Sequence, residues 1–248
     1  MTGEHAPAEF TLSGYASLVS AFKEMGYAFC AFSGARREKA HLVMRHDVDF
    51  CPKRALRIAQ VEKELGISAT YFFLVSTEFY NIYSSETARC LREIKNMGHH
   101  IGLHFDAATY DLSKIDEAAE AECQSLAGVV GDIEIVSFHR PIVSLQGAST
   151  NIAGRPHTYQ PRYFHEIEYC SDSGGEWSFG YPLERQAIRD RKALQLVTHP
   201  IWWAEDDVAS PIDRMTKFLA ERTQVLRSEL QRNLKKGHFV DNWIDKLV

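Results

Sequence analysis

The sequence predicts one α/β domain in which parallel strands form a barrel with helices outside it. Three observations lead to this prediction. The chain has 248 residues, a length at which a single barrel domain is common. Its 45% hydrophobic and 25% charged residues match a folded globular protein rather than a disordered or fibrous one. Strand-like and helix-like segments alternate along most of the chain, as repeated βα units do.

The first 40 residues predict a lead-in helix and strand. Apolar residues recur at helical spacing from Leu12 to Met25, directly after Thr11, a residue type that caps helices. The apolar run over 27–32 then predicts a strand. We expect this lead-in to precede the main βα units.

Alternating strands and helices follow from residue 41 onward. Pro52 begins a predicted helix that ends at Gly66, and the next helix ends at Gly98. β-branched and aromatic residues indicate the strands. By these criteria strands lie over 41–46, 69–75, 100–105, 133–138, 166–170 and 193–198, and later helices over 113–130 and 211–236.

The composition excludes several classes of protein. A formal net charge of −5 has the wrong sign for binding a nucleic-acid backbone, so no nucleic-acid partner is expected. The start MTGEHAPAEF does not resemble an export signal, and no run approaches the roughly 18 apolar residues of a membrane span. The five cysteines are scattered without a CxxC pair, which indicates reduced thiols. These features predict a cytoplasmic protein with no membrane span.

Polar residues of one chemical kind follow the predicted strands. The carboxyl ends of barrel strands carry the active site in α/β barrels. Imidazoles combined with a carboxylate suit Zn²⁺ or a similar divalent metal, and a hydrolytic site also needs a base and an acid. Five strand ends supply such groups, namely Asp47 with Asp49, His104 with Asp106, His139 with Arg140, Asp172, and His199.

Five motifs in order resemble those of the polysaccharide deacetylase superfamily, the NodB-homology domain of carbohydrate esterase type. They are RHDVD (45–49), GHHIGLHFD (98–106), SFHRP (137–141), SDSGGEW (171–177) and LVTHPIWW (196–203). The HDVD segment is typical of one branch of this superfamily. The resemblance implies a distorted (β/α)7 barrel that covers residues 1–248 as a single domain.

The resemblance also implies roles for the residues that match its motifs. Asp47 matches the catalytic base, Arg140 the arginine that orients this base, and His199 the general acid. Asp49 matches a metal ligand. The implied reaction is hydrolysis of an acyl group, in particular N-acetyl, from an amino sugar or polysaccharide precursor. A metal-bound water is the nucleophile.

The metal ligands of the second motif match only in part. His104 stands at the first of two family histidines, but Ala108 occupies the second position. Either His139 supplies the missing ligand, which we prefer because it ends the next strand, or the site binds metal weakly. Zinc is the expected cofactor, with cobalt, nickel or manganese as alternatives.

Four further residues are candidates for substrate contact. Asp172 and Trp177 belong to a Gly-rich turn after a strand, and Trp202 follows His199. Tyr159 lies in the segment 141–165, which has little periodicity and is long enough to cover the barrel mouth as an active-site loop. The alternative for each tryptophan is a place in the core.

Other site-adjacent residues have structural interpretations. We expect His46 and His99 to make structural hydrogen bonds within strands. Asp106 is either a partner of a ligand histidine or a solvated loop residue.

Two other functions remain open on the sequence. The same residues would suit a deformylase or another amide hydrolase with a non-polymeric substrate. Ala108 favours a different class, a catalytically inactive barrel that binds carbohydrate. The substrate and the oligomeric state cannot be derived from the sequence.

Overall fold

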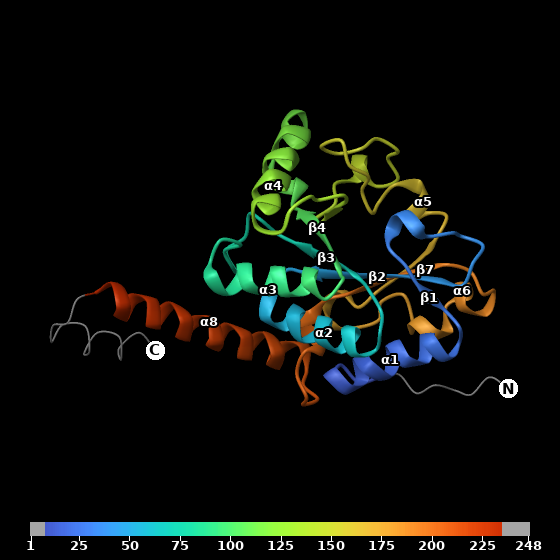
Figure 1. Ribbon diagram of the computed structural model, residues 1–248, viewed down its shortest axis with the longest axis horizontal. Coiled ribbons are helices and arrows are strands. Elements are labelled where there is room, and N and C mark those ends of the chain that lie inside the picture. The colour runs from blue at the N-terminus through green and yellow to red at the C-terminus, as the bar shows by residue number, and fades with distance from the viewer. Residues whose placement is uncertain (1–7, 235–248) are drawn as a thin grey trace. The chain divides into compact units, whose positions relative to one another are not determined.

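The computed structural model describes residues 8–234, which fall into two compact units (Figure 1). One unit lies within residues 1–208 and the other within residues 209–248. The first unit contains all strands and all candidate site residues. The second contains the helix α8 (Pro211–Asn233), whose sequence predicted a helix over 211–236. The expectation that both units belong to one domain over 1–248 stays a prediction.

The first unit is an α/β fold around a parallel sheet, as the sequence predicted. The strand order is β5-β4-β3-β2-β7-β6, and β1 pairs with the beginning of β2. Every strand pair is parallel. The strands are β1 (Ala28–Phe29), β2 (His41–Val48), β3 (Thr70–Phe73), β4 (His100–Phe105), β5 (Val136–Phe138), β6 (Glu168–Ser171) and β7 (Leu194–Thr198).

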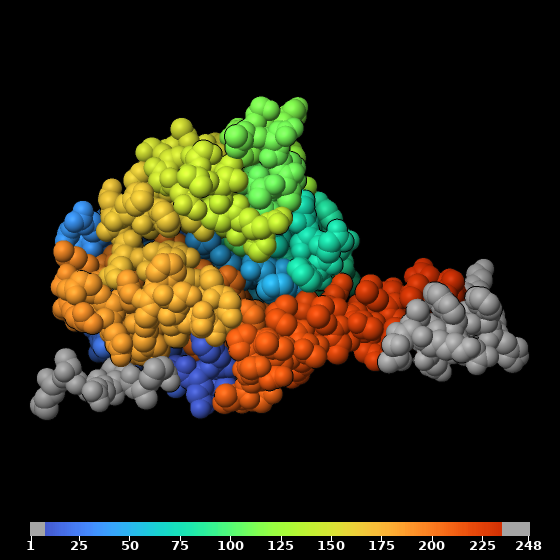
Figure 2. All heavy atoms as spheres, turned by 180° about the vertical axis from the view of Figure 1, so that it is seen from behind, coloured from blue at the N-terminus to red at the C-terminus, as the bar shows by residue number. Residues whose placement is uncertain are grey.

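The barrel is distorted because its two edge strands do not meet. Within residues 8–234, β5 and β6 are not paired with each other. Instead, Val136 of β5 forms a parallel bridge with His157. A hollow separates the yellow atoms of the segment 141–165 from the orange atoms that follow it (Figure 2). The 141–165 segment therefore begins to extend the sheet at its β5 edge.

Helices cover the outside of the sheet in chain order. They are α1 (Leu12–Glu24), α2 (Pro52–Glu64), α3 (Ser85–Asn96), α4 (Ile115–Val130) and the short α5 (Pro161–Phe164), α6 (Gln186–Arg189) and α7 (Pro200–Trp203). The Thr11 hydroxyl accepts a hydrogen bond from the Gly14 amide at 3.0 Å and caps α1 as expected. Gly66, with φ of 69°, follows α2. No helix within the described ranges has the length and apolar character of a membrane span.

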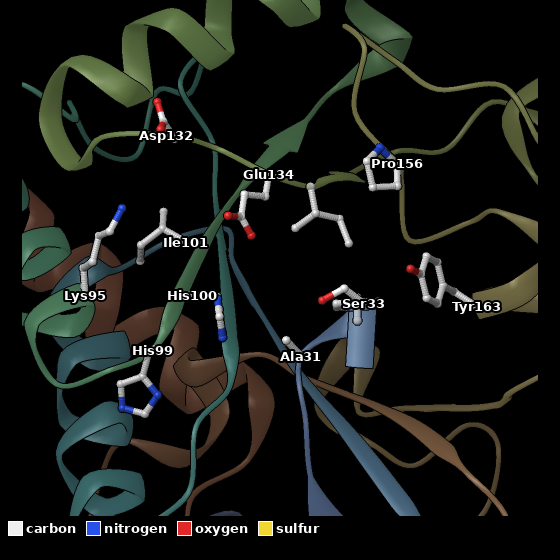
Figure 3. A pocket seen from close by; sticks show the side chains of 12 residues that line it. Ala31, Ser33, Lys95, His99, His100, Ile101, Asp132, Glu134, Pro156 and Tyr163 are labelled. Carbon is white, nitrogen blue, oxygen red and sulfur yellow. The ribbon is translucent and has the colours of Figure 1, made fainter. Parts of the chain in front are cut away.

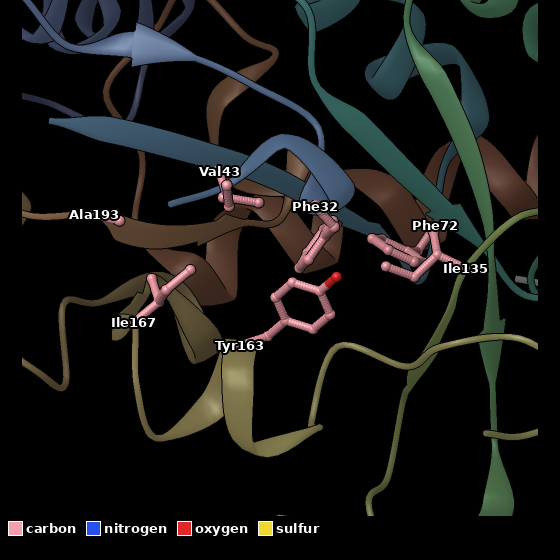
Figure 4. Packing of buried hydrophobic residues seen from close by; sticks show 8 residues of the cluster. Phe32, Val43, Phe72, Ile135, Tyr163, Ile167 and Ala193 are labelled. Atoms are coloured by element: carbon pink, nitrogen blue, oxygen red, sulfur yellow. The ribbon is translucent and has the colours of Figure 1, made fainter. Parts of the chain in front are cut away.

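The barrel interior changes from apolar to charged along β2. Successive inward positions of a strand are two residues apart. Val43 belongs to a buried apolar cluster with Phe72 and Tyr163 (Figure 4). Arg45 and Asp47 come next on the same face. The apolar floor thus leads directly to buried charges near the carboxyl end of the strand.

We expect Gly102→Ala to destabilise the first unit. A Cβ atom at this position of β4 would overlap the Phe72 ring and lie 3.0 Å from the Ile135 carbonyl oxygen. Both neighbours are buried, so overpacking should lower the free energy of unfolding by about 1–3 kcal/mol. Urea denaturation measures this change. Gly128→Ala, in the open space around α4, is the control and should stabilise by about 0.5–1 kcal/mol; equal stabilities of the two variants would contradict the prediction.

Candidate active site

Polar side chains converge where four strands end. The strand registers bring the carboxyl ends of these parallel strands to one end of the barrel. The site residues are Asp47 near the end of β2 and Asp49 just after it, His104 in β4, His139 after β5, and His199 after β7.

Asp49, His104 and His139 are the group that could hold a metal ion. Their potential ligand atoms all lie within 4.8 Å of one another. Asp49 Oδ1 is 3.1 Å from His104 Nε2 and 3.4 Å from His139 Nδ1. Ligand atoms around a tetrahedral zinc with bonds of about 2.0–2.1 Å are separated by about 3.3 Å. The two spacings therefore suit a small divalent cation.

The surroundings of Asp49 also fit a cation. Asp49 Oδ1 is buried and has no hydrogen-bond partner in the part of the chain that the structure describes. A buried carboxylate oxygen without a partner is costly unless a cation satisfies it. Burial alone would raise the pKa of Asp49, but the neighbouring histidines outweigh this effect and hold it well below its ordinary value. The carboxylate is therefore charged and ready to bind a metal.

His139, and not position 108, offers the third ligand atom. Ala108 lies in a 3-10 turn just after β4, and its methyl group offers no ligand atom. His139 reaches the site from β5, the strand that pairs with β4. The structure thus brings together the three residues that the sequence analysis preferred.

Asp47 is held by an arginine that the sequence analysis did not consider. Arg45 Nε and Nη2 donate to Asp47 Oδ1 and Oδ2, each at 2.8 Å, and both side chains are buried. Burial by itself would raise the pKa of Asp47, but Arg45 and then His104 outweigh it and lower this pKa. Asp47 is consequently deprotonated at neutral pH.

Arg140 does not make the expected contact with Asp47. Its Nε donates to Asp106 at 2.9 and 3.0 Å, and its guanidinium is half exposed. The loop after β4 places Asp106 beside Arg140, while Arg45 already occupies both oxygens of Asp47. Asp106 therefore pairs with an arginine instead of a ligand histidine, and Arg45 takes the position behind Asp47 that was expected for Arg140.

His199 is anchored by Asp172 at the end of β6. The His199 Nδ1 atom lies 2.6 Å from Asp172 Oδ1, and the His199 amide donates to the same carboxylate. Trp203 Nε1 donates to Asp172 Oδ2 at 2.6 Å. This leaves His199 Nε2 facing the metal centre, 3.8 Å from Asp49 Oδ2. Burial would lower the pKa of His199, but Asp172 outweighs it and raises this pKa to about 9.

We expect Asp172→Asn to lower the pKa of His199 in the metal-free protein. The substitution removes the largest contribution that raises this pKa, while Asp49 and Asp47 still raise it and burial still lowers it. The pKa should therefore fall clearly below about 9. An NMR titration of the imidazole resonance, assigned with a His199→Gln variant, measures this. The exposed Asp190→Asn should change nothing, and an unaltered His199 pKa in Asp172→Asn would contradict the assignment.

The same pair makes the stability of the metal-free protein depend on pH. A pKa that is raised on folding contributes stability below the pKa of the unfolded state, about 6.5 for histidine. This contribution is lost as the pH rises through about 9, the pKa of His199 in the folded protein. Urea denaturation at several pH values should show a smaller loss in Asp172→Asn than in the parent protein.

Three of the four candidates for substrate contact are buried and Trp177 is partly exposed, and their contact with substrate stays a prediction. Asp172 is fully buried, and its carboxylate is occupied by His199 and Trp203. Trp177 packs against Trp203 with ring centroids 5.9 Å apart. Trp202 is buried in α7.

Tyr159 lies inside the barrel. Its ring is buried, packs against Phe138, and faces the Arg45 guanidinium at 5.5 Å. This position follows from the pairing of the 141–165 segment with β5, where the Thr158 amide donates to the Val136 carbonyl at 3.0 Å. Tyr159 therefore lies in the barrel interior, and the expectation that the 141–165 segment covers the barrel mouth stays a prediction.

A cavity of about 680 Å³ adjoins the metal centre. Asp49 and His139 form part of its wall, which also includes Phe50, Phe79, Tyr110, Asp106 and Arg140. Phe50 and Phe79 pack edge to face at 4.9 Å. The sequence analysis missed these aromatic residues because it considered histidine and aspartate at strand ends. Their positions in the loops after β2, β3 and β4 could have indicated them.

His46 and His99 make the structural contacts that their sequence positions suggested. His46 lies in β2, whereas His99 directly precedes β4 rather than lying within a strand. Both contact the fully buried Glu62 of α2. His46 Nε2 is 2.9 Å from Glu62 Oε1, and His99 Nδ1 is 3.5 Å from Glu62 Oε2. Tyr15 and Tyr71 donate their hydroxyls to the same carboxylate at 2.6 and 2.5 Å. This cluster attaches helices to the back of β2, away from the metal centre.

A second, smaller cavity lies at the opposite ends of the strands. It has a volume of about 180 Å³, and its wall includes His100 and Ile101 at the beginning of β4. Figure 3 shows the side chains of Ser33, Glu134 and Tyr163 around it. None of its residues belongs to the metal centre.

Comparisons with known proteins give matches only among solved structures. No protein-family model matches the chain, and no curated protein does. A Streptococcus mutans CE4 esterase is 12% identical, with 93% of this chain and 98% of that chain covered and a TM-score of 0.49. A peptidoglycan N-acetylglucosamine deacetylase is 14% identical, with 83% and 90% covered and a TM-score of 0.48. A family 4 carbohydrate esterase from Bacillus anthracis is 15% identical, with 84% and 86% covered and a TM-score of 0.41.

These three solved structures align with 83–93% of this chain. Their identities of 12–15% and TM-scores below 0.5 are low. The function is therefore inferred from the side chains of this chain.

Proposed function

We propose that this protein is a metal-dependent hydrolase that removes an acyl group, in particular N-acetyl, from an amino sugar or polysaccharide precursor. The observation that carries this proposal is the arrangement at the strand ends. Asp49, His104 and His139 form a site for a divalent cation, and Asp47 and His199 lie beside it. One carboxylate and two imidazoles suit zinc, with cobalt, nickel and manganese as alternatives.

Asp47 is the proposed general base. When bound, the divalent cation would polarise the acyl carbonyl group and lower the pKa of water. Asp47 is deprotonated, and its Oδ2 is 3.7 Å from His104 Nε2, so it lies at the edge of the metal centre. A carboxylate in this place can accept the proton of the attacking water.

His199 is the proposed general acid. Asp172 holds its Nδ1 side, so that Nε2 is directed towards the metal centre. The raised pKa keeps the metal-free imidazole protonated at neutral pH. A proton on Nε2 can be given to the amine that leaves when the amide bond breaks.

The cavity beside the site supports a sugar as the substrate. Its volume of about 680 Å³ falls within the range of about 300–1,000 Å³ for small-molecule sites. The rings of Phe50, Phe79 and Tyr110 offer apolar faces, while Asp106 and Arg140 offer hydrogen bonds. Such a wall suits a ring that carries hydroxyl groups.

An activity screen tests the proposal. Metal-free protein is loaded with Zn²⁺ or Co²⁺ and incubated with N-acetylglucosamine, its oligomers and its nucleotide-linked form. We expect release of acetate that requires the metal. Simple N-acetyl and N-formyl amides are included in the same screen. Turnover of these amides alone would favour a non-sugar amidase, and sugar binding without turnover at any metal would favour a binding module.

A further inference from the structure

Arg45 has several contacts in the barrel interior besides its ion pair with Asp47. It is 1% exposed. Its Nη1 donates to Thr158 Oγ1 at 3.1 Å and to Gln195 Oε1 at 3.4 Å, in addition to the two bonds to Asp47. The rings of Phe72 and Tyr159 each lie 5.5 Å from its guanidinium carbon. The guanidinium therefore has little freedom to move, and both oxygens of Asp47 are bound to it.

Asp47 is also close enough to the metal centre to become a ligand. The ligand nitrogen His104 Nε2 is 3.1 Å from Asp49 Oδ1 and 3.7 Å from Asp47 Oδ2. Carboxylates bind divalent cations readily, so a free Asp47 at this distance would compete for a position on the metal. What distinguishes the two aspartates is their partners. Asp49 Oδ1 has no hydrogen bond among the described residues, whereas Arg45 occupies both oxygens of Asp47.

We propose that Arg45 keeps Asp47 out of the coordination shell, so that the metal has three protein ligands and an open position. Arg45 is thus a positioning residue that acts through Asp47. A catalytic zinc site differs from a structural one by this open position. The inference rests on the metal site of the proposed function. Arg45 would therefore set the number of protein ligands without being a ligand itself.

Cobalt binding tests this inference without an activity assay. The visible absorption of bound Co²⁺ depends on the number and kind of its ligands, and competition with a chelator gives its affinity. In Arg45→Met, Asp47 loses both hydrogen bonds and should become a fourth ligand. We expect a changed Co²⁺ spectrum and a tighter metal affinity, because a carboxylate would be added to the three protein ligands. In Arg45→Met with Asp47→Asn, the spectrum should return to that of the parent protein.

Two further variants complete the design. Arg54→Met removes another buried arginine that is ion-paired, to Glu205, and should leave the spectrum unchanged. Arg45→Met leaves the buried carboxylate of Asp47 without a compensating charge, so this variant is expected to be less stable than the parent protein. The double variant lacks that carboxylate and is expected to fold. If Arg45→Met does not fold, Arg45→Lys, which cannot hold both oxygens in parallel, should show part of the spectral change.

The outcomes separate this inference from the proposed function. A parent protein that binds neither Co²⁺ nor Zn²⁺ would overturn the metal-dependent function and this inference with it. A parent protein that binds metal, with an unchanged spectrum and affinity in Arg45→Met or Arg45→Lys, would overturn the inference alone. So would a double variant that keeps the changed spectrum, because Asp47 could then not be the added ligand.

Discussion

The Asp47→Asn variant is expected to keep its metal and to lose at least about a hundredfold in kcat. A positioned general base contributes about 10²–10⁴-fold to a rate, and an amide cannot accept the proton. The substitution preserves the shape of the side chain, while Asp49, His104 and His139 remain in place. Acetate release at saturating substrate gives kcat, and elemental analysis of the same sample gives the metal content.

Stability must be measured beside activity for this variant. In Asp47→Asn the buried guanidinium of Arg45 is no longer compensated by the Asp47 carboxylate. This variant is therefore expected to unfold at a lower temperature than the parent protein. Asp111→Asn makes the same chemical change at an exposed position and should affect neither kcat nor stability. Loss of metal from folded Asp47→Asn would reassign Asp47 as a ligand, and undiminished kcat would exclude it as the base.

Replacement of the ligands should have the second large effect. We expect the parent protein to bind about one divalent metal per chain and the double variant Asp49→Ala with His104→Ala to bind none. The two substitutions remove the carboxylate of Asp49 and one of the two imidazoles of the candidate metal site. Activity should disappear together with the metal, because the polarisation of the carbonyl group depends on it. Elemental analysis after incubation with Zn²⁺ and desalting measures the metal content.

A single variant tests the third ligand. His139→Ala should also lose the metal, since His139 Nδ1 is 3.4 Å from Asp49 Oδ1 and Ala108 cannot replace it. His100→Ala removes an exposed histidine at the opposite ends of the strands and should keep the metal. If His139→Ala bound metal as tightly as the parent protein, the third ligand would have to be another residue of the site.

Local sequence signals predicted the long helices and most strands of the first unit, but not the short helices α5, α6 and α7. The boundaries of α1 and α2 follow from Thr11, Pro52 and Gly66, whose backbone preferences act within one helical turn. The strand predicted over 27–32 is shorter in the structure, where β1 ends at Phe29 and a 3-10 turn begins at Phe32. The end of β1 is set by its pairing with β2, which the apolar run 27–32 does not reveal.

The group of residues that could hold a metal could also be predicted, because parallel strands bring their carboxyl ends together. Asp49, His104 and His139 stand at or just after the carboxyl ends of three different strands, and the sheet makes them neighbours. The loop path is a different matter. Backbone hydrogen bonds to Val136 place part of the segment 141–165 along the edge of β5 and bury Tyr159 beside Arg45, which the sequence did not indicate. The expectation that this segment covers the barrel mouth stays a prediction.

The sequence by itself determined the elements of this protein, their parallel order and the residue types at the strand ends. Only the tertiary structure decided which charged groups pair. Arg45 belongs to a strand that is buried on both faces, so no polar and apolar alternation shows that its side chain points inward to Asp47. Arg140 follows the expected motif and nevertheless pairs with Asp106. Ion pairs depend on distances between side chains from separate strands and loops, and these distances exist only once the barrel has formed.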